Sequence, residues 1–272
     1  MPTSISDESP KPQTIAGLTA LVTGAARGIG QAIAIDLARR GARLVLADVA
    51  PPEETLEKIR TLSPTSADSE AVAMDVTNEE QVTTLATTQA KRGTPITIAA
   101  NNAGIMQRQS ADHHTLPMDD LRRMLDVHVI GSAIVAKAVI PAMRDTNFGR
   151  IINLSSVIGL VGLPRRTAYS VAKTAITGLT RGLALENGHY GITVNAVAPG
   201  YTLTDVLKEK MKLGTLDYDL FAHRAAVRRW AEPWEIARVV GFLAEPASSF
   251  ITGAIWPVDG GYACNGDPGE DD

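Results

Sequence analysis

Tyr169 and Lys173 are two residues whose types and spacing could move a proton. They are four positions apart, so on a helix they lie on one face. A phenol with an ordinary pKa of ~10 is a poor base near neutral pH, and a nearby ammonium favours the phenolate. Oxidation of an alcohol requires such a base, because the hydroxyl proton is lost as hydride leaves carbon. The pair predicts acid–base chemistry, although on its own it would fit a solvated helix surface equally well.

A glycine-rich segment near the start of the chain could hold a dinucleotide. It reads Thr-Gly-Ala-Ala-Arg-Gly-Ile-Gly over 23–30, between an apolar run at 18–23 and a helical pattern from about 28 to 40. Glycines permit the tight turn through which a pyrophosphate approaches a helix N-terminus. The residues expected to contact the cofactor here are Gly24, Arg27, Gly28, Ile29 and Gly30.

Asp48 is the last residue of the next strand-like run, 43–48, and it bears on the choice of cofactor. A carboxylate at this position accepts hydrogen bonds from the adenosine ribose and repels a 2′-phosphate. NADP would require a basic side chain at or just after this position, and Val49 and Ala50 supply none. Arg27 is the counter-evidence, because it could reach a 2′-phosphate. We expect NAD.

The elements that must position these residues alternate along the chain. Short apolar runs alternate with longer helical patterns, which predicts an α/β domain with a doubly wound parallel sheet of the Rossmann type and helices on both faces. Strands are expected at 18–23, 43–48, 71–76, 96–101, 151–155, 192–197 and 254–258. Helices are expected at 28–40, 53–62, 79–91, 118–143, 167–187 and 233–243.

Composition and organisation favour one soluble domain. We expect a disordered lead at 1–14, a catalytic domain at 15–264 with a lid at about 204–229, and an acidic tail at 265–272. A net charge of −4 argues against nucleic acid as a partner. A single cysteine excludes an internal disulfide, and we find neither a secretory signal nor an apolar run long enough for a membrane span. A cytoplasmic protein is expected.

Two of the predicted helices are apolar around most of their circumference. They span 126–143 and 167–185, and such helices must be covered on both sides. Burial within one chain would explain them, and so would contact between subunits. We favour subunit contact and expect a homo-oligomer, either a dimer or a tetramer.

Six segments, in order, resemble the single-domain branch of the short-chain dehydrogenase/reductase family. The turn at 23–30 has three residues between its first two glycines, as in that family, and the resemblance extends from about Leu18 to Tyr262. The other matching segments are Asn-Asn-Ala-Gly at 101–104, Asn-Leu-Ser-Ser at 153–156, Tyr-Ser-Val-Ala-Lys at 169–173, Asn-Ala-Val-Ala-Pro-Gly at 195–200 and Asp-Gly-Gly at 259–261.

The resemblance implies roles for further residues. It implies that Ser156, whose spacing to Tyr169 fits the family pattern, donates to the substrate oxygen as charge develops. It implies that Asp75 and Val76 contact adenine, and that Thr202 and Thr204 lie near the nicotinamide and phosphates. The remaining cofactor contacts it implies are Asn102, Ala103, Gly104, Tyr169, Lys173, Pro199 and Gly200.

His128 departs from the family pattern. Many members carry an asparagine at the aligned position, where it is thought to hold a water that links the lysine to solvent. An imidazole can also bind a water and can itself titrate near neutral pH. A core histidine that caps a backbone carbonyl is the structural alternative. We expect a role in proton relay and count His128 with the catalytic residues.

The substrate is less well defined by the sequence. Arg108, His113 and Arg166 follow predicted strand ends, where ligands bind in open α/β sheets. The segment Asn-Asn-Ala-Gly-Ile at 101–105 followed by Arg108, together with Pro199–Tyr201 and Arg229-Trp230, gives a weaker resemblance to gluconate and deoxygluconate dehydrogenases, which implies a sugar acid or polyol. Steroids, other cyclic alcohols and 3-oxoacyl thioesters stay open.

Two other functions compete with an NAD-dependent dehydrogenase. An NADPH-dependent 3-oxoacyl or ketone reductase is possible in the same family, and Asp48 speaks against it. A non-catalytic, cofactor-sensing protein on the same fold would have a broken Ser–Tyr–Lys set, and all three residues are present. No metal is expected, because the histidines lack a convincing ligand spacing.

Overall fold

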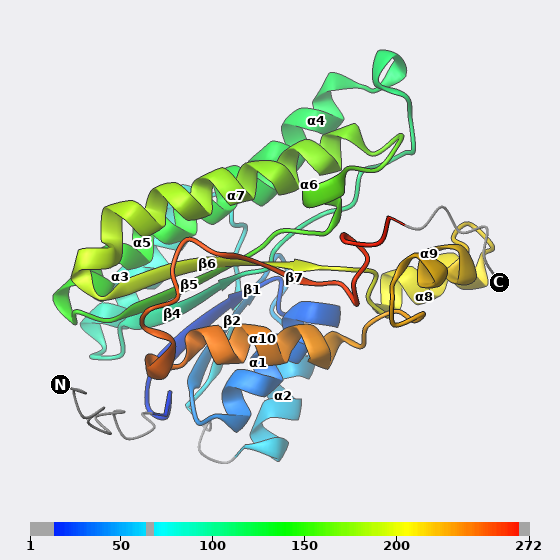
Figure 1. Cartoon of the computed structure of the whole chain (residues 1–272). Coiled ribbons are helices and arrows are strands. Elements are labelled where there is room, and N and C mark those ends of the chain that lie inside the picture. Colours follow the sequence, from blue (N-terminus) through cyan, green and yellow to red (C-terminus); the bar gives the residue numbers. More distant parts are fainter. Residues whose placement is uncertain (1–13, 64–67, 267–272) are drawn as a thin grey trace, which may run out of the picture.

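A seven-stranded parallel sheet forms the centre of the computed structural model, which describes residues 14–63 and 68–266. Its strand order is β3-β2-β1-β4-β5-β6-β7, so the chain winds outward from β1 in one direction and from β4 in the other (Figure 1). The strands are β1 (Thr19–Thr23), β2 (Arg43–Asp48), β3 (Glu70–Ala73), β4 (Ile96–Asn101), β5 (Gly149–Leu154), β6 (Ile192–Pro199) and β7 (Ile255–Val258).

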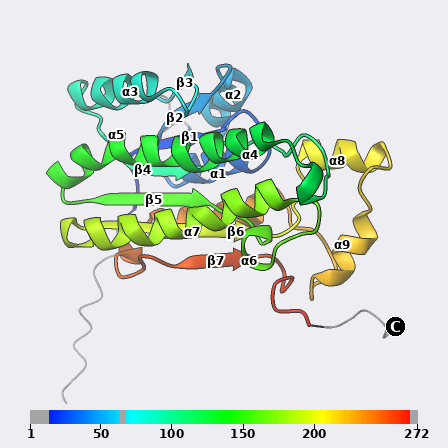
Figure 2. The same cartoon turned by 90° about the horizontal axis from the view of Figure 1, so that it is seen from above.

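Helices cover both faces of the sheet (Figures 1 and 2). One face carries α1 (Gly28–Arg39), α2 (Glu53–Leu62) and α10 (Pro233–Ala244), and the other carries α3 (Glu79–Lys91), α5 (Gly131–Asp145) and α7 (Thr167–Asn187). Separate apolar cores fill the two sides, one around Ile33, Leu37 and Val240, the other around Val135 and Val139. This arrangement confirms the predicted doubly wound single domain.

Most predicted elements agree with the structure to within two residues. The third strand differs most, because it occupies Glu70–Ala73 and ends before the predicted residue 76. Met74 leaves the strand but still donates its N–H to the Asp48 carbonyl at 2.7 Å. The predicted lead up to residue 13, and residues 267–272 of the predicted acidic tail, lie outside the described residues.

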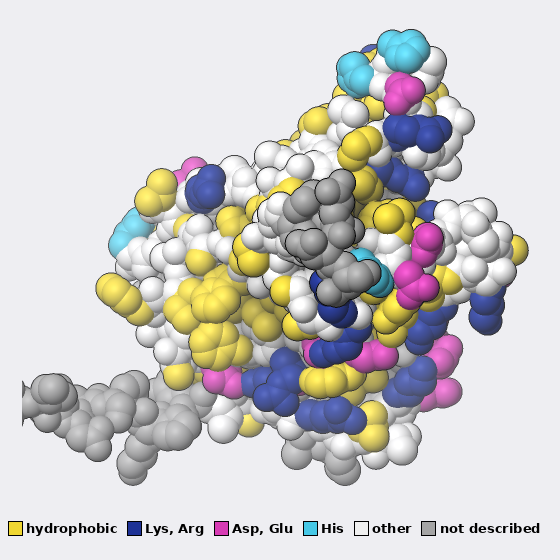
Figure 3. Space-filling model, turned by 45° about the vertical axis from the view of Figure 1, so that its right-hand side comes forward, with side chains coloured by type: hydrophobic (Ala, Val, Ile, Leu, Met, Phe, Trp, Pro, Cys, Tyr) yellow, Lys and Arg dark blue, Asp and Glu magenta, His cyan; other side chains and the backbone are white. Residues whose placement is uncertain are grey.

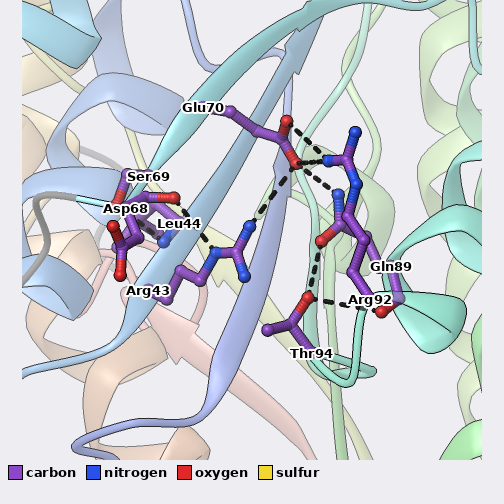
Figure 4. A network of polar contacts seen from close by, with 8 residues as sticks. All are labelled: Arg43, Leu44, Asp68, Ser69, Glu70, Gln89, Arg92 and Thr94. Carbon is purple, nitrogen blue, oxygen red and sulfur yellow. Dashed lines mark hydrogen bonds and ion pairs between the residues drawn. The ribbon is translucent and has the colours of Figure 1, made fainter.

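A network around Glu70 holds the edge strand β3 against its neighbours (Figure 4). The Glu70 carboxylate lies 3.2 Å from Arg92 at the end of α3 and 3.9 Å from Arg43 on β2, and it also accepts a hydrogen bond from Gln89. Thr94 in turn donates to the Gln89 side chain at 3.1 Å. Because this network lies where β3 begins, it stabilises the sheet away from the strand ends that carry the motifs.

The predicted helix at 118–143 is three consecutive segments. α4 (Met118–Leu125) leads into a π-helical segment, η3 (Asp126–Ile130), and then into α5. Such π segments are rare and often occur at functional sites, and this one contains His128. By length and composition the whole stretch to Asp145 would qualify as a membrane span, contrary to the expectation from the sequence. Its α5 part packs on β4 and β5, which explains its apolar character.

Candidate active site

The predicted site residues meet at the carboxyl edge of the sheet. The turn after β1, the loop after β4, the segment after β5 and the segment after β6 all leave the sheet on this edge. α6 (Ile158–Val161), α8 (Asp205–Lys212) and α9 (Tyr218–Arg224) lie at the same end of the molecule (Figures 1 and 2). Ligands bind at this edge in open parallel sheets.

The glycine-rich turn is built for close approach of its own backbone. A Cβ at Gly30 would overlap the Gly24 carbonyl oxygen, so only glycine fits there. Thr204, just before α8, lies over the turn, with its methyl group 3.3 Å from where a Cβ at Gly28 would stand. The segment after β6 therefore packs against the turn after β1.

Asp48 is fixed to this turn. One carboxylate oxygen accepts from the Ala26 N–H at 3.0 Å, and the other accepts from the Val49 N–H at 2.8 Å. Arg27, the residue that could reach a 2′-phosphate, is exposed. The negative charge thus has a defined position at the end of β2, where the ribose of a nicotinamide dinucleotide would lie.

Asn102 supports the turn from the next strand. Its side chain donates to the carbonyls of Thr23 and Gly24, both at 3.0 Å, and the N–H groups of Asn102 and Ala103 both donate to the Thr23 hydroxyl. Thr23 was not among the predicted residues, yet its hydroxyl joins the ends of β1 and β4. Asp75 is exposed and accepts from Thr77 at 2.8 and 2.9 Å.

The segment after β6 is also fixed at this edge. The Pro199 carbonyl accepts from the Val157 N–H at 2.9 Å, which joins β6 to the residue next to Ser156. Thr202 is buried and donates to the Gly200 carbonyl at 3.1 Å. Val76, by contrast, is buried against Gly131 at the start of α5.

The Ser156, Tyr169 and Lys173 side chains come together at the start of α7. The Ser156 hydroxyl accepts from the Ile158 N–H at 3.2 Å and lies near enough to Tyr169 to lower its pKa by hydrogen bonding, whereas Ser155 donates to the Lys173 carbonyl at 2.8 Å and so has a structural partner. The Lys173 ammonium lies 5.7 Å from the centre of the Tyr169 ring and donates to the Leu154 carbonyl at 2.7 Å. These contacts favour Ser156 over Ser155 as the reactive serine.

Burial dominates the electrostatics of this group. It raises the pKa of Tyr169, and the Ser156 hydrogen bond only partly opposes that rise. Burial also lowers the pKa of Lys173 from 10.5 to about 7. The sequence predicted that the Lys173 ammonium lowers the pKa of Tyr169. In the protein without a cofactor, burial outweighs that effect, because it raises the pKa of Tyr169 and lowers the pKa of Lys173. A cation bound beside Tyr169 would be needed to favour the phenolate.

Lys173→Met should change stability in a pH-dependent way. Because the folded pKa of Lys173 is about 7 and its ordinary value is 10.5, the unfolded chain binds more protons between these values. Wild-type stability should therefore rise with pH across this window, and that of the variant should not. Melting temperatures of the cofactor-free proteins should favour Lys173→Met most below pH ~7 and progressively less up to pH ~10. Lys91→Met, on the exposed end of α3, should track the wild type; a constant difference for Lys173→Met would contradict this account.

His128 is buried behind Tyr169, and its ring is neutral. Its edge faces the Tyr169 ring at 5.8 Å between centroids, and its Nε2 lies 3.0 Å from the oxygen and 3.2 Å from the nitrogen of Ile105. Burial first and the Lys173 charge second lower its pKa to about 3. The expectation that this imidazole titrates near neutral pH was wrong, since the sequence does not show its burial. Its Nδ1 is buried without a hydrogen-bond partner among the described residues.

Gln107 is a site residue that sequence reasoning missed. It is buried in the loop after β4, donates to the carbonyls of Gln109 (2.7 Å) and Arg165 (3.1 Å), and accepts from the Tyr169 N–H at 3.4 Å. Asp120 of α4 holds the same loop by accepting from the Arg108 N–H at 3.0 Å. A glutamine in a loop carries no motif, so only the structure shows that it positions the start of α7.

The three predicted substrate residues are placed differently. Arg166 stands at the N-cap position of α7, one turn before Tyr169, without a side-chain capping bond. Burial raises the pKa of Tyr201 and the Arg166 charge partly opposes that rise; the Tyr201 ring packs against the same apolar cluster as Tyr169. Arg108 is exposed, and His113 lies exposed in η2 (His113–Thr115), a turn that projects beyond α4. Figure 3 shows histidine side chains at this outer tip. No contact between described residues joins Arg108 or His113 to Tyr169.

The predicted lid contains α8 and α9 and is held by aromatic rings. Tyr201 stacks on Phe221 of α9 at 4.2 Å between centroids and lies 5.1 Å from Trp230. Trp230 stacks on Tyr218 at 5.2 Å and donates to its carbonyl at 3.1 Å. Arg229 forms a bidentate ion pair with Glu235 of α10, at 2.7 and 2.8 Å, so its guanidinium already has a partner.

The sheet order, the glycine-rich turn and the Ser156–Tyr169–Lys173 group define a nicotinamide-dependent oxidoreductase. A family model described as enoyl-(acyl carrier protein) reductase matches residues 24–263. The chain belongs to the short-chain dehydrogenase/reductase family, as its motifs predicted.

Relatives of this chain act on different substrates. It is 39% identical over 252 residues to a 3-oxoacyl-(acyl-carrier-protein) reductase of Pseudomonas aeruginosa, covering 91% of this chain and 98% of the relative. It is 38% identical over 253 residues to a cis-4-hydroxycyclohexanecarboxylate dehydrogenase of Sinomonas cyclohexanicum, covering 92% and 98%. Membership of the family therefore leaves the substrate open.

Solved structures of similar proteins contain either form of the cofactor. An NAD⁺-bound xylitol dehydrogenase is 34% identical, with a TM-score of 0.82 over 92% of this chain and all of the other. A protein of Agrobacterium tumefaciens assigned as a 2-deoxy-D-gluconate 3-dehydrogenase, with bound NADP, is 31% identical, with a TM-score of 0.84 over 94% of this chain and all of the other. The preference between NAD and NADP depends on the residues of this chain.

Proposed function

We propose that this protein is an NAD-dependent dehydrogenase of secondary alcohols that uses Tyr169 as general acid and base. The observation that carries the proposal is the convergence of Ser156, Tyr169 and Lys173 on one edge of the sheet, opposite a turn that holds the Asp48 carboxylate. The substrate class suggested by the sequence is a sugar acid or polyol.

The chain's residues divide the reaction between them. Ser156 binds the substrate oxygen, and Tyr169 removes the hydroxyl proton of the substrate. Lys173, when protonated, places a positive charge near the phenol. A bound nicotinamide would supply the hydride acceptor, and its positive charge would favour the Tyr169 phenolate that burial otherwise opposes. The glycine-rich turn, Thr202 and Thr204 would hold the dinucleotide, and the backbone approach at Gly30 fits that role.

The choice of NAD rests on Asp48. Both of its oxygens keep lone pairs after accepting from Ala26 and Val49, so ribose hydroxyls can still donate to them. A 2′-phosphate would bring like charges together at this fixed position. The cofactor-binding residues proposed from the family resemblance are otherwise compatible with either dinucleotide.

We assign His128 to the proton relay as a neutral hydrogen-bonding group. Its Nε2 is engaged with Ile105, and its buried Nδ1 has no hydrogen-bond partner among the described residues, so Nδ1 would be the atom that binds the relay water. A neutral imidazole can hold such a water without being titrated in the physiological range.

His128→Ala should lower kcat by about tenfold or more while leaving the dissociation constant for NAD unchanged, because the relay and not the cofactor site is lost. His128→Asn should restore most of the rate, since an amide can replace the bond to Ile105 and bind a water. Steady-state rates over a range of pH would test this. An unchanged rate and pH profile in His128→Ala would remove His128 from the relay.

A ketone or 3-oxoacyl reductase that uses NADPH is the alternative enzyme. The Pseudomonas aeruginosa relative favours it, and Asp48 opposes it.

We further propose that the protein is a cytoplasmic homo-oligomer, either a dimer or a tetramer. Subunit contact is supported by the apolar side chains of Ile130 and Val171, which are exposed on the helices predicted to form it.

Reduction of NAD or NADP by sugar acids, polyols, cyclic alcohols and hydroxysteroids, and oxidation of NADH or NADPH by 3-oxoacyl thioesters, test the proposed function. We expect turnover of a secondary alcohol with NAD and a higher kcat/KM for NAD than for NADP. Activity confined to NADPH and a 3-oxoacyl thioester would support the alternative, and no turnover with any of these would favour a sensing role.

A further inference from the structure

The first turn of α7 carries Tyr169 and has no capping side chain of its own. α7 begins at Thr167, and its N-cap residue, Arg166, makes no side-chain capping bond. Tyr169 is the third helical residue, so its N–H has no acceptor within the helix. A helix end without such partners frays, and here the fraying would reach the reacting residue.

The Gln107 side chain supplies the missing partner from a distant loop. Its Oε1 accepts from the Tyr169 N–H at 3.4 Å, and its Nε2 donates to the Arg165 carbonyl at 3.1 Å. Arg165 lies four residues before Tyr169 and has a left-handed backbone, with φ of 63°. In a continuous helix the Arg165 carbonyl and the Tyr169 N–H would bond to each other. The Gln107 amide is inserted between these two groups and satisfies both, and we call this pair of hydrogen bonds the Gln107 bridge.

The backbone of Gln107 is itself fixed on both sides by α4. The preceding Met106 carbonyl accepts from the Arg123 guanidinium at 3.3 Å, and the following Arg108 N–H donates to the Asp120 carboxylate at 3.0 Å. Asp120 and Arg123 form an ion pair at 3.2 Å, and the Asp120 side chain is only 2% exposed. Because Gln107 is also buried, its amide holds the start of α7 at a defined position relative to α4.

The phenol has little freedom apart from that of its backbone. The Tyr169 ring packs against one apolar cluster that contains Met124 of α4 and another that contains Val157, next to Ser156. A third contact comes from the His128 ring, at 5.8 Å between centroids. These contacts restrict rotation of the Tyr169 ring, so the phenolic oxygen moves with the backbone. A displacement of a reacting group by about 1 Å can lower a rate by about 10²-fold.

We propose that Gln107 is a positioning residue for Tyr169, which places the phenol by completing the first turn of α7. The inference rests on the proposed function, in which Tyr169 exchanges a proton with the substrate. Gln107 needs no contact with the substrate or the cofactor for this role, so its loss should slow turnover and leave binding intact. Both ends of the amide are used, since one accepts from Tyr169 and the other donates to Arg165.

Gln107→Met tests the proposal, because it keeps the length of the side chain and removes its donor and its strong acceptor. With the secondary alcohol that the wild type oxidises fastest, kcat should fall by about tenfold or more. The KM for that alcohol and the dissociation constant of NAD should stay unchanged. The control Gln109→Met makes the same exchange on an exposed side chain of the same loop and should keep the wild-type kcat. A Gln107→Met variant that loses only thermal stability, or whose loss is confined to KM, would overturn the proposal.

Hydrogen exchange of backbone amides tests the Gln107 bridge without any turnover. In the cofactor-free wild type, the Tyr169 amide should be protected to the same degree as the amides one turn further along α7, because Gln107 is its acceptor. In Gln107→Met this amide should exchange about tenfold faster or more, whereas the amides at 180–187, at the far end of α7, should keep their wild-type rates.

The wild-type measurement is decisive even if Gln107→Met does not fold. Rapid exchange of the Tyr169 amide would refute the bridge, and with it the positioning role, whether or not any alcohol is oxidised. Protection of this amide in a protein that oxidises none of the alcohols would count against the proposed function and not against the bridge.

Discussion

Tyr169→Phe should retain cofactor binding and lose about 10³-fold in kcat, the largest effect of any single change at this site. The substitution removes only the hydroxyl whose pKa burial raises and Ser156 partly lowers. The ring should keep its edge contact with His128, so the start of α7 should not move. Steady-state turnover with the best alcohol of the panel, and titration of NAD by protein fluorescence, measure the two properties separately.

Tyr190→Phe is the matched control for this experiment. Tyr190 lies after the far end of α7 and its ring packs against His189, so removal of its hydroxyl should leave turnover unchanged. If Tyr169→Phe kept a tenth or more of the wild-type rate, the proton would have to be transferred by another group.

Asp48→Asn should change the choice of cofactor. The amide oxygen can still accept from Ala26, so the turn should keep its shape, while the charge that repels a 2′-phosphate is gone. The ratio of kcat/KM for NAD to that for NADP should fall on the order of 10²-fold, because like charges in contact cost several kcal/mol. Initial rates with both cofactors at one fixed alcohol concentration give this ratio.

Glu186→Gln removes a negative charge at the other end of the molecule. It lies near the C-terminus of α7, is exposed, and should leave the cofactor ratio unaltered. A wild-type enzyme that already preferred NADP, or an Asp48→Asn variant with an unchanged ratio, would show that this carboxylate does not select the cofactor.

The sheet could be predicted because its strands are buried on both faces. Such strands read as continuous apolar runs, as at Ile96–Asn101, and the helices between them have a distinct period. The glycine-rich turn and the Tyr169–Lys173 spacing could be recognised because they are local in sequence. Because the carboxyl ends of parallel strands meet at one edge of the sheet, the predicted topology also placed the glycine-rich turn and the Tyr169–Lys173 pair close together.

The rest of the site depends on contacts between distant segments. The sequence does not show that Gln107 reaches the backbone of Tyr169. Nor does it show burial, which makes His128 neutral and lowers the pKa of Lys173. Protonation states are set by the surroundings of a group, and those surroundings exist only after folding.

The hydrogen bonds of Gln107 and Arg165 have a consequence for how such an enzyme can diversify. The loop after β4 is joined through Gln107 to Arg165, just before α7, and to Tyr169 in the first turn of α7. An insertion or deletion in either loop would shift the backbone of Tyr169 unless the other changed with it. Evolution or design of new specificity should therefore exchange 105–111 and 162–166 as one unit, transplanted together from the same donor.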